Sequence, residues 1–394
     1  MKFTISVTLA FCSFLAVYGS ANAADSTVPE PFRGFDAASK LAINYDDLNT
    51  LLQSLVADIG LSNREKADLG HAKTGTRMKT KVQRSTINEG NRFYYETFVD
   101  NEAGQQTLRN IQKSIERVPD EMPLENFTRD EQLAYWLNLY NITVLNEVVK
   151  EYPRRNFKKL LLGKNSILSK KLLTVAGVPL SLNDIQYKIL KQNYDSNPLI
   201  IYGLYQGIIG GPNIRSSAYT GADVYSALTE NAIVFINSNR GTSVRDAKNF
   251  RVSSYYERNK EYFPDFRADL TAHLLEYLEG NERTAIQEAA KLKADISDWT
   301  VTDLGGSYRE IGGSLAHSSA GLMGAMSGSN SADSGGALGA ASGAGPSSAG
   351  GLNPALLRRM KELAAEREQA KAEDTAAPVD ESNAAPAEAE PISD

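Results

Sequence analysis

The sequence predicts an α+β fold: one mostly helical domain with a small β component, followed by a disordered C-terminal tail. Apolar residues recur at helical spacing in several segments, whereas few short segments look extended. Hydrophobic residues make up 42% of the chain, which is enough to build a core. Fourteen of the 30 glycines lie between Gly305 and Gly351. Large apolar residues nearly vanish there, so burial cannot offset the entropy cost of ordering that region.

Residues 1–23 have the parts of a secretory signal peptide. Lys2 precedes a short apolar run that reaches Val17, and small residues follow up to Ala23. The run is short for a membrane span, although an N-terminal anchor is the alternative. We therefore expect cleavage after Ala23, export to the periplasm or the extracellular space, and a mature chain without a transmembrane span. Residues 24–34 are expected to form an extended leader.

The first part of the domain is predicted to be helical. Leucines recur at helical spacing over residues 48–56, and a second helix is expected over 102–117. The strongest helix spans residues 128–150. It starts with Thr128 and Glu131, which fit a capping box, and continues with an apolar stripe that includes Trp136 and Tyr140 as expected core residues.

The second part mixes short extended and helical segments. Residues 172–180 look extended, with a turn at Gly177-Val178-Pro179. Helices are expected over 181–191, 220–236, 265–279 and 281–294, and Asp184, Asp223 and Asp265 are expected to be helix caps. The folded domain is placed at residues 35–302. The tail, residues 303–394, is rich in Gly, Ser and Ala and then acidic, with an isolated helix at 354–373.

Charge and thiol content exclude several classes of protein. The chain has 42 Lys and Arg against 48 Asp and Glu, a net charge of −6, which argues against a nucleic-acid partner. The one cysteine, Cys12, lies in the signal peptide, so the mature chain would have no disulfide and no thiolate nucleophile. No metal site or cofactor is predicted. Of His71, His273 and His317, none has the sequence context of a catalytic base. Residues 73–84 carry five basic residues and no acid, which is typical of a solvated loop, with contact to an anionic partner as the alternative.

Five segments in order resemble one family. They are Glu131-Gln132-Leu133-Ala134-Tyr135-Trp136-Leu137-Asn138-Leu139-Tyr140-Asn141, Leu180-Ser181-Leu182-Asn183-Asp184-Ile185, a Pro-led strand and small-residue loop from Pro198 to Pro212, Tyr219-Thr220-Gly221, and Val252-Ser253 before Asp265-Phe266. Over residues 129–278 the chain resembles the "domain of unknown function 547" family. The family has no settled activity, so the resemblance implies a fold more than a function.

The resemblance also implies a degenerate site. Many relatives carry a Glu-His pair, a histidine on the strand and a Ser-Cys-Pro motif, which suggest a thiol-type site by analogy. This chain has Gln186-Tyr187, Ile201-Tyr202-Gly203-Leu204 and Gly210-Gly211-Pro212 at those places. It is therefore not expected to be a cysteine-dependent enzyme, and no catalytic residue is assigned.

The best candidate ligand site is the glycine-containing segment 202–215. Its glycines would let backbone N–H groups converge into an anion site, with Arg215 holding a carboxylate or phosphate. A tight structural loop with Arg215 in a local salt bridge is the alternative. Asn138 and Asn141 share a helix face and either line a cleft or tie down a neighbouring loop. The candidate binding residues are Asn138, Asn141, Gln186, Tyr187, Tyr202, Tyr205, Gln206, Gly210, Gly211 and Arg215.

Two functions remain open. The first is a non-catalytic envelope binding or scaffold protein, whose partner would be a small anionic ligand or an envelope protein. The second is an envelope hydrolase or transferase that uses carboxylate, Tyr or Ser groups. A cleft that gathers the tyrosines around a buried carboxylate would favour the enzyme, whereas a filled core at those positions would favour the binding protein.

Overall fold

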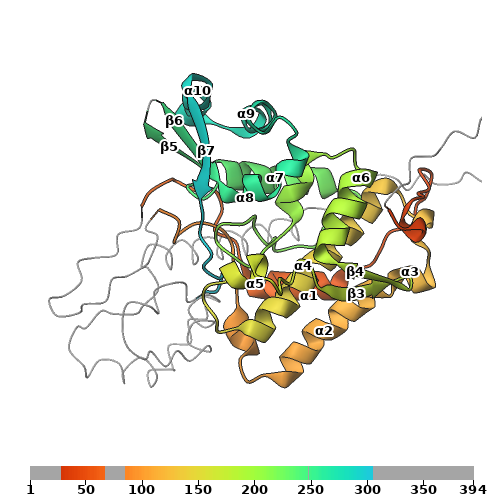
Figure 1. Ribbon diagram of the computed structural model, residues 1–394. Coiled ribbons are helices and arrows are strands. Elements are labelled where there is room, and N and C mark those ends of the chain that lie inside the picture. The colour runs from red at the N-terminus through yellow and green to blue at the C-terminus, as the bar shows by residue number, and fades with distance from the viewer. Residues whose placement is uncertain (1–27, 67–84, 247, 305–394) are drawn as a thin grey trace, which may run out of the picture.

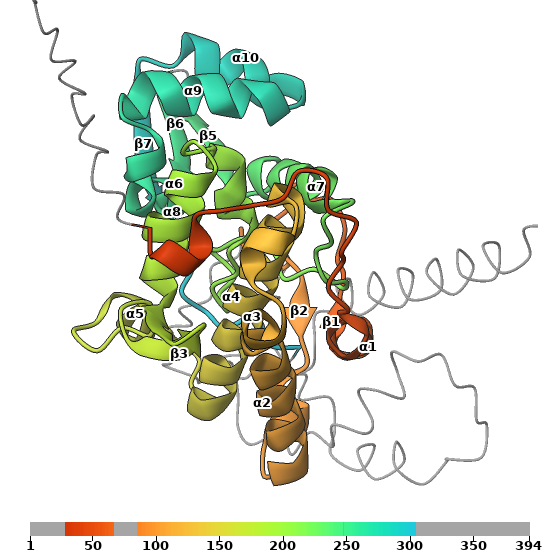
Figure 2. The same cartoon turned by 90° about the vertical axis from the view of Figure 1, so that its right-hand side faces the viewer.

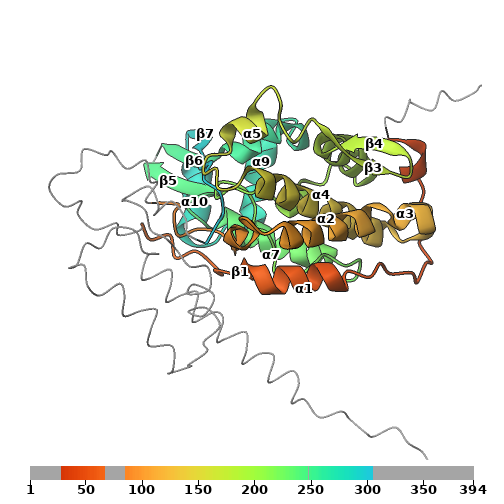
Figure 3. The same ribbon diagram turned by 90° about the horizontal axis from the view of Figure 1, so that it is seen from below.

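The helix α4 (Arg129–Glu151) runs through the middle of the domain, and most other elements pack around it (Figures 1 and 3). The Thr128 side chain accepts a hydrogen bond from the backbone N–H of Glu131 at 3.2 Å, so the threonine half of the predicted capping box is confirmed. The other half is wrong, because the Glu131 carboxylate accepts from the N–H groups of Ile43 and Gly221 instead, at 2.9 and 2.8 Å. Eighteen of its 23 residues are buried. The helix is therefore covered on every side rather than along one apolar stripe, and its polar side chains need partners inside the protein.

The computed structural model describes residues 28–66, 85–246 and 248–304. In this part of the chain the fold is mostly helical with small sheets, as the sequence predicts. The α-helices are α1 (Asp46–Leu55), α2 (Glu102–Glu116), α3 (Val118–Glu121), α4, α5 (Lys158–Leu162), α6 (Lys191–Asn193), α7 (Val224–Ile236), α8 (Ser254–Arg258), α9 (Phe266–Tyr277) and α10 (Gly280–Glu288). Five 3-10 helices cover Glu30–Phe32, Tyr95–Phe98, Leu124–Asn126, Pro198–Gly203 and Lys260–Tyr262, and Asp184–Leu190 is a π-helix that runs directly into α6.

Three small sheets complete the described fold. They contain β1 (Val56–Ala57) with β2 (Arg92–Phe93), β3 (Lys171–Val175) with β4 (Val178–Ser181), and β5 (Thr242–Asp246), β6 (Asn249–Ser253) and β7 (Lys291–Ile296) in that order. The β6–β7 pair is parallel and the other pairs are antiparallel. The three-stranded sheet lies with α9 and α10 at one end of the molecule, and α2 lies at the other (Figures 1 and 2).

Two predicted elements of the second half are wrong. The predicted helix 281–294 ends at Glu288, because residues 291–296 instead form the strand that pairs with β6. The turn expected at Gly177-Val178-Pro179 lies one residue earlier, at Ala176 and Gly177, which both have positive φ. Pro179 is inside β4 and pairs with Thr174.

The strand expected from Pro198 is also wrong. The segment forms a 3-10 helix, in which Asn197 accepts a hydrogen bond from the N–H of Leu199 at 2.9 Å and Pro198 occupies the first turn. Its residues are buried on all sides, so its apolar pattern alone does not distinguish a strand from a helix.

The folded region extends past both predicted boundaries. Phe32 belongs to the expected extended leader, yet it is fully buried in a 3-10 turn with its ring edge-on to Trp136 at 4.9 Å. At the other end Asp303 and Leu304 are buried, and Asp303 accepts a hydrogen bond from the Tyr152 hydroxyl at 2.9 Å. The signal peptide, the basic run 73–84 and the tail from residue 305, with its expected helix, lie outside the described residues.

Candidate functional site

A polar cleft of about 290 Å³ lies where four segments far apart in the sequence meet. They are α5 with the loop after it, the helix that begins near Asn183, the segment after the 3-10 helix at 198–203, and the end of α8. The lining residues are Leu161, Leu162, Ser166, Leu168, Ser169, Asn183, Gln186, Tyr187, Gln206, Arg258 and Asn259. The described lining therefore combines leucine side chains with amides, hydroxyls and one cation.

Arg258 is the charged group of this cleft. Its guanidinium donates to the side-chain oxygen of Gln206 at 2.6 Å and lies between the rings of Tyr255 and Trp299, 5.1 and 5.0 Å from their centroids. Its Nε is buried and has no hydrogen-bond acceptor. Among the described residues no carboxylate lies within ion-pair distance of it. The cleft therefore holds a fixed positive charge that the described part of the protein does not neutralise.

An amide network sets the floor of the cleft. The Gln186 side chain donates to the Asn259 side-chain oxygen, and Asn259 in turn donates to the backbone carbonyl of Tyr255 at 2.8 Å. The Tyr187 hydroxyl donates to the carbonyl of Arg258 at 3.2 Å, and Tyr262 donates to the carbonyl of Gln186 at 3.0 Å. These bonds join the π-helix to the end of α8, so the cleft is held in one shape.

The π-helix Asp184–Leu190 carries two of the cleft residues and has a firmly held start. Ser181 and Asp184 form a reciprocal capping box, because the Asp184 carboxylate accepts from Ser181 and the Asp184 N–H donates to the Ser181 hydroxyl. Burial opposes ionisation of Asp184, but Lys171, Lys188 and Ser181 outweigh it and hold the pKa of this carboxyl well below its ordinary range. Single π-helical turns are frequent at functional sites, which agrees with the position of Gln186 and Tyr187.

The electrostatics of the cleft favour binding of an anion over proton transfer. Burial lowers the pKa of Arg258, although an arginine stays protonated at any physiological pH. Burial, together with the negative charge of Glu261, raises the pKa of Tyr187 to about 12. Tyr187 is therefore protonated near neutral pH, when it can donate a hydrogen bond but cannot act as a base.

Gln186, Tyr187 and Gln206 are the predicted site residues that the structure brings together. Tyr202 and Tyr205 are fully buried elsewhere and do not line the cleft. The Tyr202 hydroxyl lies 3.1 Å from that of Tyr256 and 3.0 Å from Nε2 of His273, whereas Tyr205 bonds to Tyr95 and Thr302. These two tyrosines therefore occupy filled core.

Asn138 and Asn141 tie down neighbouring segments. Each amide makes two hydrogen bonds that imitate backbone pairing: Asn138 with the N–H and C=O of Tyr219, and Asn141 with the C=O of Gly203 and the N–H of Tyr205. The cavity beside them is about 10 Å³, which leaves room for one water molecule at most. The interpretation of these residues as anchors for a loop is the one the structure supports.

The glycine segment and Arg215 do not form an anion site in this structure. The N–H groups of Ile209, Gly210 and Gly211 already donate to the carbonyls of Thr300, Asp298 and Ile208. A Cβ at Gly210 would lie 2.6 Å from the Asp298 carbonyl oxygen. The expectation of converging free N–H groups is therefore wrong, because the segment forms backbone pairs with residues 298–302.

Arg215 forms a local salt bridge, which was the alternative to an anion site. Its guanidinium forms an ion pair with Glu230 at 2.8 Å, donates to the Ala227 carbonyl at 3.1 Å, and lies over the Tyr219 ring. It is not among the residues that line the polar cleft. The arginine of the cleft is instead Arg258, which the sequence did not single out.

The three expected helix caps behave differently. Asp265 caps α9 by accepting from the N–H of Ala268 at 3.1 Å, as predicted, and Asp184 acts through the capping box. Asp223 occupies the N-cap position of α7, but its carboxylate accepts from the N–H and hydroxyl of Thr220 instead of the helix. These bonds close a turn over residues 220–223, so α7 begins later than predicted.

No helix among residues 28–66, 85–246 and 248–304 is long and apolar enough to cross a membrane. In the same part of the chain, three or more His, Cys, Asp or Glu side chains do not gather in any arrangement that would hold a metal ion.

The fold and the cleft define a mostly helical α+β protein with a preformed, cationic polar cleft. Residues 124–236 match the sequence model of the family "Protein of unknown function, DUF547". This part of the chain is therefore similar to that family, in agreement with the resemblance found in the sequence. The match ends with α7, so Arg258 and Asn259 are contributed from beyond it. Comparisons with curated proteins and with solved structures give no match.

Proposed function

We propose that this is an exported binding protein whose cleft holds a small anionic ligand without catalysing a reaction on it. The observation that carries the proposal is the position of Arg258: a fixed cation in the cleft, with no carboxylate paired to it in the described part of the chain. A ligand carboxylate or phosphate would supply the missing negative charge and accept hydrogen bonds from the planar guanidinium.

The remaining lining suits a ligand with a polar head and a short apolar part. Asn183, Gln186 and Ser169 bring polar groups to the cleft, whereas Leu161 and Leu168 bring apolar side chains. Pockets with an apolar lining and a few convergent polar groups are typical small-molecule sites. A volume of about 290 Å³ limits the ligand to a small one.

Two features favour a binding protein over the hydrolase or transferase alternative. Among the described residues that line the cleft none is a carboxylate, so this lining supplies no acid–base pair. The tyrosine that does line it, Tyr187, has a pKa raised to about 12 and is a poor base or nucleophile at neutral pH.

The export part of the proposal rests on the sequence of residues 1–23. A charged start, a short apolar run and small residues before Ala23 support removal of a signal peptide and a location in the periplasm or outside the cell. Mass spectrometry of the mature protein from the envelope fraction tests this. The expected N-terminus is Ala24, and an intact Met1 in the cytoplasm would contradict it.

The binding part is tested with two arginine variants that differ in position but not in chemistry. Calorimetry with succinate and with inorganic phosphate measures the affinity of the unaltered protein, of Arg258→Gln and of Arg215→Gln. Because a charge-assisted pair contributes about 1.5–3 kcal/mol, Arg258→Gln should weaken binding roughly ten- to a hundredfold. Arg215→Gln should leave affinity unchanged, since Arg215 is already paired with Glu230.

Arg258→Lys distinguishes loss of charge from loss of shape. Lysine keeps the positive charge but lacks the planar fork, so it should restore only part of the affinity. Equal binding by the unaltered protein and Arg258→Gln, with both correctly folded, would rule out Arg258 as the anion anchor. Failure of both probes to bind the unaltered protein would contradict the proposed ligand chemistry.

A further inference from the structure

A second basic feature lies at the rim of the cleft, in residues 150–171. This segment carries eight Lys and Arg residues and one acid, Glu151, although the chain as a whole has a net charge of −6. It includes α5 and the loop that leads into β3, and it projects from the side of the domain (Figure 2). The excess of positive charge is therefore local and is opposite in sign to the charge of the protein.

Several of these cations already have partners. Lys150, Arg154 and Lys171 form ion pairs with Glu147, Glu151 and Asp184, and Lys158 lies over the Trp299 ring at 5.9 Å. Lys159, Lys164 and Lys170 are exposed. None of them forms an ion pair within the described part of the chain. These three exposed ammonium groups are therefore available to bind an anionic partner.

An exposed apolar side chain lies among these lysines. Leu162, the last residue of α5, is 48% exposed, whereas its neighbours Leu160 and Leu161 are buried. A projecting leucine flanked by lysines is the arrangement by which peripheral proteins contact a membrane: the apolar side chain enters the headgroup boundary and the ammonium groups bind anionic lipids.

We propose that α5 and the loop at residues 163–170 form a docking surface for an anionic lipid membrane. The positive charge of the surface is opposite to that of an anionic leaflet, and the exposed leucine favours lipid over a soluble polyanion, which has no apolar interior. The surface borders the mouth of the cleft, because Leu161, Leu162, Ser166, Leu168 and Ser169 line that cleft. Docking would bring the cleft close to the membrane, although the inference does not depend on which ligand the cleft holds.

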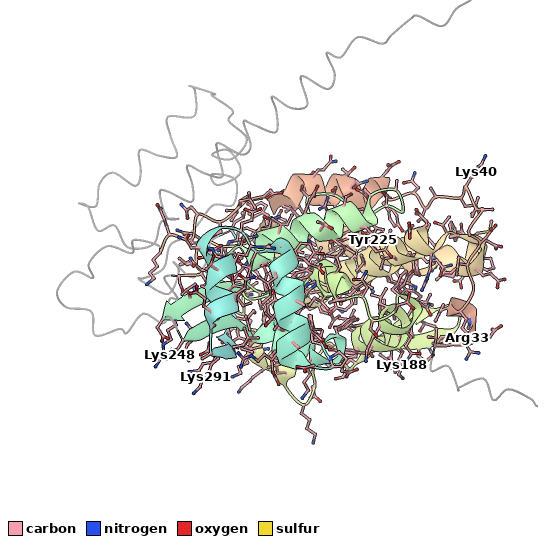
Figure 4. All side chains as sticks on the ribbon, turned by 90° about the horizontal axis from the view of Figure 1, so that it is seen from above. Arg33, Lys40, Lys188, Tyr225, Lys248 and Lys291 are labelled. Atoms are coloured by element: carbon pink, nitrogen blue, oxygen red, sulfur yellow. The ribbon has the colours of Figure 1, made fainter. Side chains whose placement is uncertain are left out.

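The test compares two triple charge reversals in the full chain. One carries Lys159→Glu, Lys164→Glu and Lys170→Glu on the proposed surface. The control carries Lys40→Glu, Lys248→Glu and Lys291→Glu, which changes the net charge equally at exposed positions far from α5 in the sequence (Figure 4). Binding is measured by co-sedimentation with phosphatidylcholine vesicles, with and without phosphatidylglycerol.

The unaltered protein should bind only the vesicles that contain phosphatidylglycerol. It should be released when the salt concentration is raised from about 0.1 M to about 1 M, because the Debye length falls from ~10 Å to ~3 Å. The surface variant should bind at least about a hundredfold more weakly, since each lost basic residue contributes about a factor of five and each introduced glutamate adds repulsion from the anionic lipid. The control should bind almost as well as the unaltered protein.

A second variant tests the apolar contact. Leu162→Ser keeps all the charges, and it should weaken vesicle binding roughly fivefold while leaving retention on soluble polyaspartate unchanged.

Equal losses in both triple variants would show that only net charge matters. Unchanged vesicle binding by the surface variant would place the contact elsewhere, for example in the basic run 73–84. Retention on polyaspartate without any vesicle binding would assign the surface to an acidic protein. Each of these three outcomes overturns the proposal.

Discussion

Replacing Gly210 with alanine should break the contact between the glycine segment and residues 298–302. An added Cβ would lie 2.6 Å from the backbone oxygen and 2.7 Å from the backbone nitrogen of Asp298. Both are main-chain atoms, so no side-chain rotation relieves the overlap. The two segments must separate, which strains the hydrogen bonds from Gly210 to Asp298 and from Ile209 to Thr300, each 2.9 Å long.

The expected loss of stability follows from these contacts. Two backbone hydrogen bonds contribute about 0.5–1.5 kcal/mol each, and overpacking a tight site adds about 1–3 kcal/mol. A glycine-to-alanine change also lowers the entropy of the unfolded chain, which offsets about 0.4–1 kcal/mol. The free energy of unfolding should therefore fall by about 2–5 kcal/mol. For a domain of this size that lowers the melting temperature by roughly 5–15 °C.

The neighbouring glycine provides the matched control. A Cβ at Gly211 would lie 3.3 Å from the Cβ of Gln206 and 3.5 Å from the nearest atoms of Ile208, distances that small shifts can accommodate. Thermal unfolding followed by circular dichroism should show Gly211→Ala within about 1 kcal/mol of the unaltered protein. A stable Gly210→Ala variant, or a larger loss in Gly211→Ala, would refute the assigned packing of this segment.

Two further predictions concern pH and the end of the domain. Burial lowers the pKa of His273 to about 4, so the unfolded chain binds the extra proton more readily. The free energy of unfolding should therefore fall as the pH drops from about 6.5 towards 4, and this imidazole should account for about 2 kcal/mol of the loss at pH 5. Urea unfolding at both pH values measures the loss, which should be smaller by that amount in His273→Gln. Truncation after Leu304 should leave the melting temperature nearly unchanged, whereas truncation after Thr302 should lower it, because Asp303 and Leu304 are buried.

The sequence predicts those elements that local interactions determine. The helices α2 and α4 agree with the prediction within one or two residues, because helical periodicity and a side-chain cap act over a few neighbouring residues. The Asp265 cap and the β3–β4 hairpin also depend on interactions between residues that are close in the sequence, so they too could be predicted. The family resemblance added Gln186 and Tyr187 as site residues, which periodicity alone would not have singled out.

Contacts between distant segments decided the rest. The strand β7 exists because β6, about 40 residues earlier in the chain, offers it a partner, and this pairing overrides the helical pattern of residues 281–294. Arg258 joins the cleft because α8 folds back onto Gln206, which is 52 residues away in the sequence. Arg215 carries the same charge but lies beside Glu230. A sequence determines which side chains are cations, whereas only tertiary packing determines which of them is left without a counter-charge.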